Sequence, residues 1–229
     1  WLYRPSGYAE SDRSRYELDR RASLISWLVM PPEAVSDDRL RNVVILMAGF
    51  DTNTAIELLE GILETDGENV YALAQVITLY LTMQDLGNAE KHAQKILSNP
   101  KLRSNNLMQE CLADVVLFRG GTEQALEIYE ALFARMIDGD FRYLDVAMKL
   151  ISTYILVGDT EKALVTCETT DGLREIATSL EVICLSHENR PDEAVALGKE
   201  LLAKFPTCHP VFYLLYTKIE GRDSTILMD

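Results

Sequence analysis

The sequence contains few of the residues that metal and redox chemistry use. Its 229 residues include only 3 histidines and 4 cysteines. The cysteines are too sparse for a disulfide scaffold, and no two of them form a CxxC pair. We therefore predict free thiols in a reducing intracellular compartment, with the cytoplasm as the expected location, and no metal and no cofactor. The cysteines are Cys111, Cys167, Cys184 and Cys208.

Phosphate-binding glycine loops and long apolar runs are absent as well. Neither GxGxxG nor GxxxxGK[ST] occurs, so we interpret Gly120–Gly121 as a turn between two helices. No run reaches the roughly 18 apolar residues that a membrane span requires. Residues 1–21 lack the apolar stretch of a signal peptide. These absences favour a chain that neither inserts into a membrane nor binds a nucleotide through such a loop.

Positive charge is also scarce. The chain has 22 Lys and Arg against 36 Asp and Glu, a formal net charge of −14. Phosphate backbones attract basic surfaces, so nucleic acid is not an expected partner. Residues 1–41 are neutral, and the whole acidic excess falls in residues 42–229. With 48% hydrophobic residues, the chain has enough apolar surface to form a folded core.

What the sequence does contain is a repeated helical pattern. Five segments each place an alanine at the start of an apolar stretch whose spacing is that of one helix face. The intervals between these alanines are 34, 36, 38 and 31 residues. A breaker, usually glycine, precedes each alanine, and another apolar segment lies upstream of the breaker. The alanines are Ala55, Ala89, Ala125, Ala163 and Ala194.

Each repeat is therefore predicted to be a helix, a tight turn and a second helix. The two helix axes cross near the turn, where only a small side chain allows them to pack closely. One such pair cannot bury its own apolar face, so neighbouring pairs must stack. The second helices are predicted to start near Asn53, Gly87, Thr122, Thr160 and Pro191. The predicted first helices cover residues 39–48, 70–83, 107–118, 144–157 and 176–186.

The pattern resembles the tetratricopeptide repeat (TPR) family, whose motif has a small residue in each helix with larger apolar residues around it. In the third repeat, Ala125 and Tyr129 match this motif, and in the fifth, Ala194 and Pro206 match it. The resemblance covers residues 36–221. It implies an all-α fold, a right-handed α–α superhelix of about five helix–turn–helix repeats and a capping helix.

This interpretation divides the chain into three parts. An extension with one helix at 13–30 occupies residues 1–35, the array occupies 36–221, and a tail occupies 222–229. We expect the extension to dock either on the first repeat or on another chain. The repeats are predicted at 36–69, 70–105, 106–143, 144–174 and 175–208, and the capping helix at 209–221.

The resemblance also implies a concave surface, lined by the first helices, that binds partner segments. A ligand carboxylate would meet Glu110 and Asp114 there, with Lys149 as a lone cation. This disfavours the clamp with which TPR co-chaperones hold an acidic chain terminus, and favours helical or extended segments with apolar and some basic residues. Alternatively, the groove is filled by this chain itself, for example by residues 1–35, or the convex face or an edge makes the contact. The groove residues are Tyr71, Gln75, Thr78, Thr82, Leu107, Glu110, Asp114, Asp145, Met148, Lys149, Ser152, Ser179 and Ile183.

We accordingly expect a non-enzymatic adaptor or scaffold, a subunit of a larger hetero-oligomeric complex that binds other proteins through the groove or the array edges. One alternative is a chaperone or targeting receptor that binds peptides transiently. Another is an enzyme with a site outside the repeats, for which Cys184 and His187, three residues apart on one predicted helix, are the best candidates. We interpret His92 as polar surface and the remaining helix cysteines as core residues.

Overall fold

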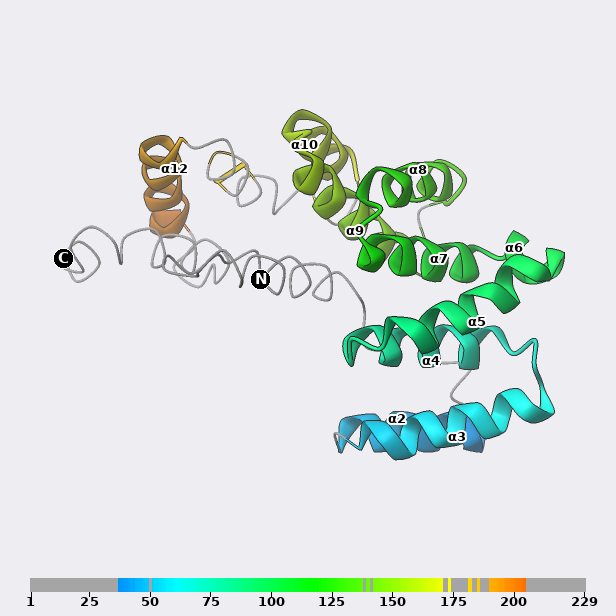
Figure 1. Cartoon of the computed structure of the whole chain (residues 1–229). Coiled ribbons are helices and arrows are strands. Elements are labelled where there is room, and N and C mark those ends of the chain that lie inside the picture. Colours follow the sequence, from blue (N-terminus) through cyan, green and yellow to red (C-terminus); the bar gives the residue numbers. More distant parts are fainter. Residues whose placement is uncertain are drawn as a thin grey trace. The chain divides into compact units, whose positions relative to one another are not determined.

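The computed structural model describes residues 37–49, 51–137, 139–140, 142–170, 173, 181–182, 185 and 190–204. This part of the chain holds ten helices and no strand, so the all-α prediction is confirmed (Figure 1). None of its helices combines the length and the apolarity that a bilayer crossing needs. The helices are α2 (Asp38–Ala48), α3 (Thr52–Thr65), α4 (Val70–Thr82), α5 (Leu86–Ser98), α6 (Pro100–Ser104), α7 (Asn106–Arg119), α8 (Thr122–Phe133), α9 (Tyr143–Val157), α10 (Thr160–Thr169) and α12 (Pro191–Lys204).

The predicted helix pairs coincide with these elements. Helices α2, α4, α7 and α9 are the first helices of four repeats, and α3, α5, α8, α10 and α12 are second helices. The helix predicted at 13–30, the capping helix at 209–221 and most of the helix at 176–186 lie outside the described residues. The division of the chain into extension, array and tail stays a prediction.

The turn between the two helices of a repeat is built in the same way five times. In each, a backbone N–H at the start of the second helix donates to a carbonyl five residues earlier, in the first helix. Four residues after each donor comes the alanine of the repeat, which is at most 5% exposed. The small side chain thus lies where the two helices approach, as the sequence predicted. The bonds join Asp51 to Leu46 (2.9 Å), Asp85 to Tyr80 (2.8 Å), Gly121 to Val116 (3.0 Å), Asp159 to Tyr154 (2.9 Å) and Arg190 to Leu185 (3.0 Å).

Aspartate caps the second helix in three of the repeats. The side chains of Asp51, Asp85 and Asp159 each accept from a backbone N–H three residues ahead, at 3.1–3.2 Å. The third repeat has Gly121 at this position, where a Cβ atom would lie only 3.0 Å from the Cγ1 atom of Val116. Glycine therefore precedes the helix in the third repeat, whereas aspartate caps it in the other three.

The residue just before each cap takes a left-handed backbone conformation in three repeats. Glycine holds this position at Gly120 (φ 104°) and Gly158 (φ 85°), where the lack of a Cβ removes the steric penalty. In the second repeat the residue is Gln84, with φ 61°. The turn therefore imposes its geometry on a residue that does not favour it.

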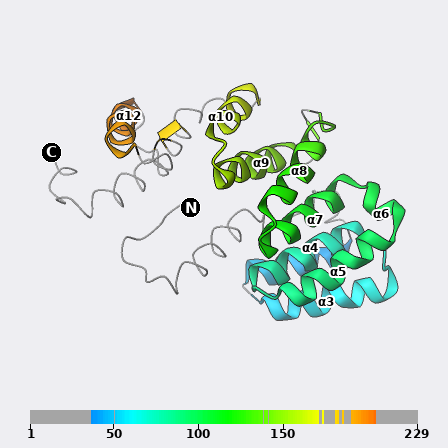
Figure 2. The ribbon, with the colours of Figure 1, turned by 45° about the horizontal axis from the view of Figure 1, so that its top comes forward.

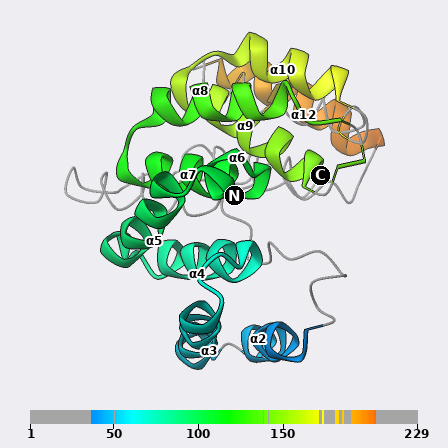
Figure 3. The ribbon, with the colours of Figure 1, turned by 90° about the vertical axis from the view of Figure 1, so that its right-hand side faces the viewer.

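The chain divides into two compact units, and the boundary falls inside α9 between Lys149 and Leu150. In the unit that contains residues 37–149, α2 packs on α3, α3 on α4, α4 on α5 and α7, and α7 on α8. Figures 2 and 3 show this succession from two further sides. The short helix α6, which the sequence analysis did not predict, connects α5 to α7 and buries Leu102.

The other unit includes, among the described residues, the end of α9, α10 and α12. Within it, the Nζ atom of Lys162 lies 5.4 Å from the centre of the Tyr154 ring, a cation–π contact. The thiol of Cys167 donates to the carbonyl of Leu173 at 3.3 Å. These contacts join α10 to the segments on either side of it.

Candidate functional site

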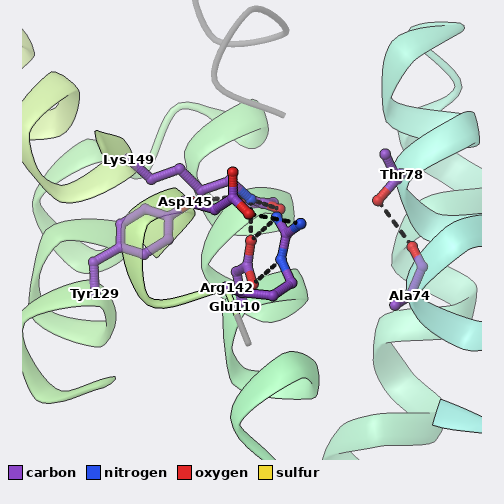
Figure 4. Close-up of polar contacts among 8 residues, drawn as sticks. Ala74, Thr78, Glu110, Tyr129, Arg142, Asp145 and Lys149 are labelled. Atoms are coloured by element: carbon purple, nitrogen blue, oxygen red, sulfur yellow. Dashed lines mark hydrogen bonds and ion pairs between the residues drawn. The ribbon is translucent and has the colours of Figure 1, made fainter. Parts of the chain in front are cut away.

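The predicted groove positions on α4 are mostly internal. Gln75 and Thr78 are 0% and 1% exposed, and the Thr78 hydroxyl donates to the carbonyl of Ala74 at 2.9 Å (Figure 4). Thr82 is half-buried, and its hydroxyl donates to the carbonyl of Leu79 at 2.8 Å. Tyr71 is half-buried. On this helix the threonine hydroxyls bind the backbone of their own helix, which satisfies them without a ligand.

Two acidic residues stand one turn apart on α7, and both are buried. Glu110 is 1% exposed and Asp114 is 2% exposed. Since an unpaired buried carboxylate is very unfavourable, such positions require cations nearby. The structure supplies two cations: Arg142, the residue before α9, and Lys149, within α9.

Glu110 and Asp114 share these cations in one network, and Figure 4 shows Glu110 with Arg142 and Lys149. The Arg142 guanidinium donates from Nε to Glu110 Oε2 at 2.8 Å and from Nη2 to Glu110 Oε1 at 2.6 Å. The Lys149 ammonium donates to Glu110 Oε1 at 2.6 Å and to both oxygens of Asp114, at 2.9 and 2.7 Å. The Tyr129 hydroxyl of α8 donates to Asp114 Oδ1. The network therefore connects α7, α8 and α9.

The electrostatics of the network favour the ionised forms of Glu110 and Lys149. Burial opposes the charge on Glu110, but Lys149 and Arg142 outweigh burial and lower the pKa of Glu110 to about 2. Burial also opposes the charge on Lys149, yet Asp114 and Glu110 raise the pKa of its ammonium. Burial and the neighbouring Glu110 raise the pKa of Asp114, against the pull of Lys149.

This network corrects the sequence interpretation of the groove charges. Lys149 does not stand alone, because it is bonded to both carboxylates and Arg142 lies beside it. The two carboxylates and two cations carry formal charges that cancel, so Glu110 and Asp114 are not free to repel a ligand carboxylate. Arg142 was missed because it lies in the connection before α9. The sequence indicates such a cation only indirectly. Glu110 and Asp114 lie one turn apart on an apolar helix, and carboxylates buried there require cations nearby.

Arg142 is held in an uncommon backbone conformation. Its φ is 75°, in the left-handed region that few side chains adopt. Its side chain is 3% exposed and also contacts Asp145 Oδ2 through Nη1 at 3.1 Å. A strained residue with a buried, bidentate ion pair fixes the start of α9 against α7.

The remaining groove positions differ in accessibility. Met148 is 40% exposed and the side chain of Asp145 is 51% exposed. Leu107 and Ser152 are half-buried. Ser179 and Ile183 lie outside the described residues, as do Cys184 and His187. Among the predicted residues that the structure describes, the most accessible are thus on α9.

A second polar cluster joins the first two repeats. Glu60 of α3 accepts from the hydroxyl of Tyr80 at 3.1 Å and lies 2.8 Å from Nε2 of His92 on α5. His92 is 1% exposed, so its interpretation as polar surface was wrong. Its Nδ1 atom is buried and has no hydrogen-bond partner among the residues that the structure describes. Burial lowers the pKa of His92, although Glu60 opposes the shift.

The described cysteines are structural. Cys111 and Cys167 are free thiols, each 1% exposed, as expected for core positions. Burial raises the pKa of both thiols, which suppresses the reactive thiolate. Within the described residues, no three His, Cys, Asp or Glu side chains converge in a way that could hold a metal ion.

No protein-family model matches the sequence, and no curated protein matches it. Solved structures do match the fold. A thermophilic TPR protein of Thermus thermophilus, TTC0263, has a TM-score of 0.58 at 18% identity, covering 80% of this chain and 98% of its own. The MamA protein has a TM-score of 0.52 at 18% identity, covering 81% and 93%. YrrB, described as a TPR protein with an unusual peptide-binding site, has a TM-score of 0.51 at 12% identity, covering 80% and 95%.

The repeated turns, the buried alanines and these similarities give the same result. The chain has the fold of a tetratricopeptide-like helical-repeat protein.

Proposed function

We propose that the chain is a non-enzymatic adaptor, a subunit of a larger protein assembly that binds segments of other proteins through the first helices of its repeats. The observation that carries the proposal is the repeated helix–turn–helix fold. In this fold, ion pairs from Arg142 and Lys149 hold α9 against α7, while Asp145 and Met148 remain accessible. A rigid surface with exposed side chains suits recognition of a protein segment, because little ordering entropy is lost on binding.

The similarity to YrrB supports the same class of function. That protein is described as having a peptide-binding site, and its fold covers 80% of this chain. Helical-repeat folds present extended surfaces for segments of other proteins. The accessible residues on α9 indicate where such a segment would bind.

The experiment is affinity purification of the full chain from its native source, followed by a salt wash and mass spectrometry. A fixed, stoichiometric set of proteins after the wash supports a structural subunit. A diffuse set that the wash removes would instead support a transient receptor. An empty result would contradict the proposal, and thiol profiling of Cys184 would then test the enzymatic alternative.

The location of binding needs matched variants. Met148→Glu places a charge on the accessible face of α9, and Val165→Glu does the same on α10, where the valine is 52% exposed. Loss of the partners in Met148→Glu but not in Val165→Glu supports binding through the first helices. Loss of the partners in Val165→Glu but not in Met148→Glu would indicate that the second helices make the contact.

A further inference from the structure

Positive charge is concentrated in one short stretch of this acidic chain. Residues 42–90 contain eight Asp or Glu and no Lys or Arg, whereas residues 91–109 contain four Lys or Arg and no Asp or Glu. The four cations lie on two consecutive helices, α5 and α6, which pack against each other. Three of them are exposed and Lys95 is half-buried. They are here called the basic strip: Lys91, Lys95, Lys101 and Arg103.

The cations of the basic strip form no ion pair with any residue that the structure describes. Other exposed cations of the chain do form one. A nitrogen of Arg39 lies 3.0 Å from a carboxylate oxygen of Asp37, and the Nζ atom of Lys162 lies 3.4 Å from one of Asp159. The charge of the basic strip is therefore available to a ligand.

Carboxylates around α5 do not neutralise the basic strip, because they are bonded to other groups. A carboxylate that already accepts a hydrogen bond or an ion pair gains little by turning towards a solvated lysine. Glu60 lies 2.8 Å from the imidazole of His92, Glu68 accepts from the amide of Asn99 at 2.8 Å, and Glu90 lies 3.7 Å from Arg119.

The spacing of the cations indicates the form of a complementary ligand. Lys91 and Lys95 are four residues apart on α5, so they lie on one face, separated by about 6 Å along the helix axis. In an extended segment, side chains at alternate positions point to the same side and are about 6.6 Å apart. Acidic residues at alternate positions of such a segment can thus face both lysines.

The surroundings of the basic strip disfavour a broad anionic surface. Glu57 and Glu64 are exposed on α3, the helix whose Glu60 contacts α5. A membrane or a nucleic acid would approach these carboxylates together with the strip, and the net charge of −14 would add to the repulsion. A short protein segment contacts the strip alone.

We propose that the basic strip binds an extended, acidic segment of a partner protein, with Asp or Glu at alternate positions. This adds a second binding surface, on α5 and α6, to the one proposed on the first helices. The ligand carries charge of the opposite sign to the basic residues expected in segments that bind the first helices. The proposal does not depend on binding through the first helices.

The test uses the full chain and a fluorescent peptide of about 12 residues with glutamate at alternate positions and serine or threonine between them. A counterpart peptide carries glutamine in place of glutamate. Two double variants, Lys91→Gln/Lys95→Gln and Lys101→Gln/Arg103→Gln, each remove half of the basic strip. Arg135→Gln/Lys199→Gln is the matched control, because it removes the same charge from two exposed residues outside the strip. Thermal unfolding of each variant checks that the fold is retained.

We expect the glutamate peptide to bind with a Kd below about 1 mM at low salt and at least about tenfold more weakly at 300 mM salt. Each strip variant should weaken binding by about fivefold or more, and the control by less than about twofold. The glutamine peptide should bind at least about tenfold more weakly. No binding of the glutamate peptide, equal binding of the two peptides, or equal effects of strip variants and control would each overturn the proposal.

Two further measurements test other occupants of the basic strip. Vesicles that contain phosphatidylserine are sedimented with the chain, and we expect no binding. Binding to vesicles that the strip variants abolish would assign the strip to a membrane surface and overturn the proposal. A dimer of the full chain in analytical ultracentrifugation that the strip variants abolish would identify a second copy of this chain as the occupant, and would also overturn it.

Discussion

Glu110→Gln tests the buried network most directly. The substitution keeps the size of the side chain and removes its charge. Glu110 is 1% exposed and accepts two bonds from Arg142 and one from Lys149. In the variant, Lys149 keeps its bonds to Asp114, whereas Arg142 loses its buried bidentate carboxylate and keeps its contact with the half-exposed Asp145. Removal of one partner from a buried ion pair costs about 3–5 kcal/mol.

The expected loss is therefore about 3–5 kcal/mol in the free energy of unfolding, measured by urea titration and circular dichroism at pH 7. At about 2–4 °C per kcal/mol for a chain of this size, the Tm falls by roughly 6–20 °C. Glu57→Gln is the control, because Glu57 is exposed on α3, and we expect a change within about 0.5 kcal/mol. A loss below about 1 kcal/mol in Glu110→Gln would refute the network as a source of stability.

The pH dependence of the same variant gives a second readout. The pKa of Glu110 is lowered to about 2 in the folded chain. Its contribution is fully present above the unfolded value of 4.5 and is lost as the pH falls through 4.5 towards 2. The raised pKa of Asp114 acts with the opposite sign, so protonation of Asp114 partly offsets the loss. Glu110→Gln should lose less stability between pH 5 and pH 3 than the unmodified chain. An identical slope in both would contradict the assignment.

Three further predictions concern the repeat turns and the junction of the first two repeats. Gln84→Gly removes a left-handed backbone penalty and should stabilise the chain by about 0.5–1 kcal/mol in urea unfolding; a destabilised variant would show that the Gln84 side chain is needed. Ala125→Leu overpacks a helix crossing and should lower the free energy of unfolding by about 1–3 kcal/mol. Ala131→Leu is the control, because Ala131 is exposed on the same helix, and it should lower that free energy little. Similar effects of the two substitutions would refute the close approach of the helices at Ala125. Because burial lowers the pKa of His92, the unfolded chain binds its proton more readily, so stability should fall as the pH drops through 6.5. His92→Gln should reduce this loss of stability, measured as the shift of the urea unfolding midpoint between pH 7.5 and pH 5.5. The same shift in the variant and in the unmodified chain would contradict the prediction.

Much of the local structure follows from short-range patterns. Ala55, Ala89 and Ala163 each precede an apolar helix face, and all three lie fully buried beside a turn. This was predictable because periodicity and small residues act over a few positions along the chain. The aspartate caps were equally local, since each stands four residues before its alanine, and they could have been found from the same segments.

The candidate site could not be predicted in this way. The residues Glu110 and Asp114 were placed correctly on the first helix of the third repeat, but their partner Arg142 is 32 residues away from Glu110. Whether two charges meet depends on how α7 and α9 pack, and no local pattern records that contact. The same holds for His92, whose burial comes from Glu60 and Tyr80 on two other helices.

The amino-acid pattern alone therefore specifies the helices, their turns and the repeat, because these depend on neighbours within one or two turns of the chain. Only the packing of α7, α8 and α9 decides that Lys149 is buried and Met148 is exposed. The physical reason is that the buried charges of one helix must meet opposite charges on another, and this requirement sets the rotation of α9 together with the burial of Val146, Ala147 and Leu150.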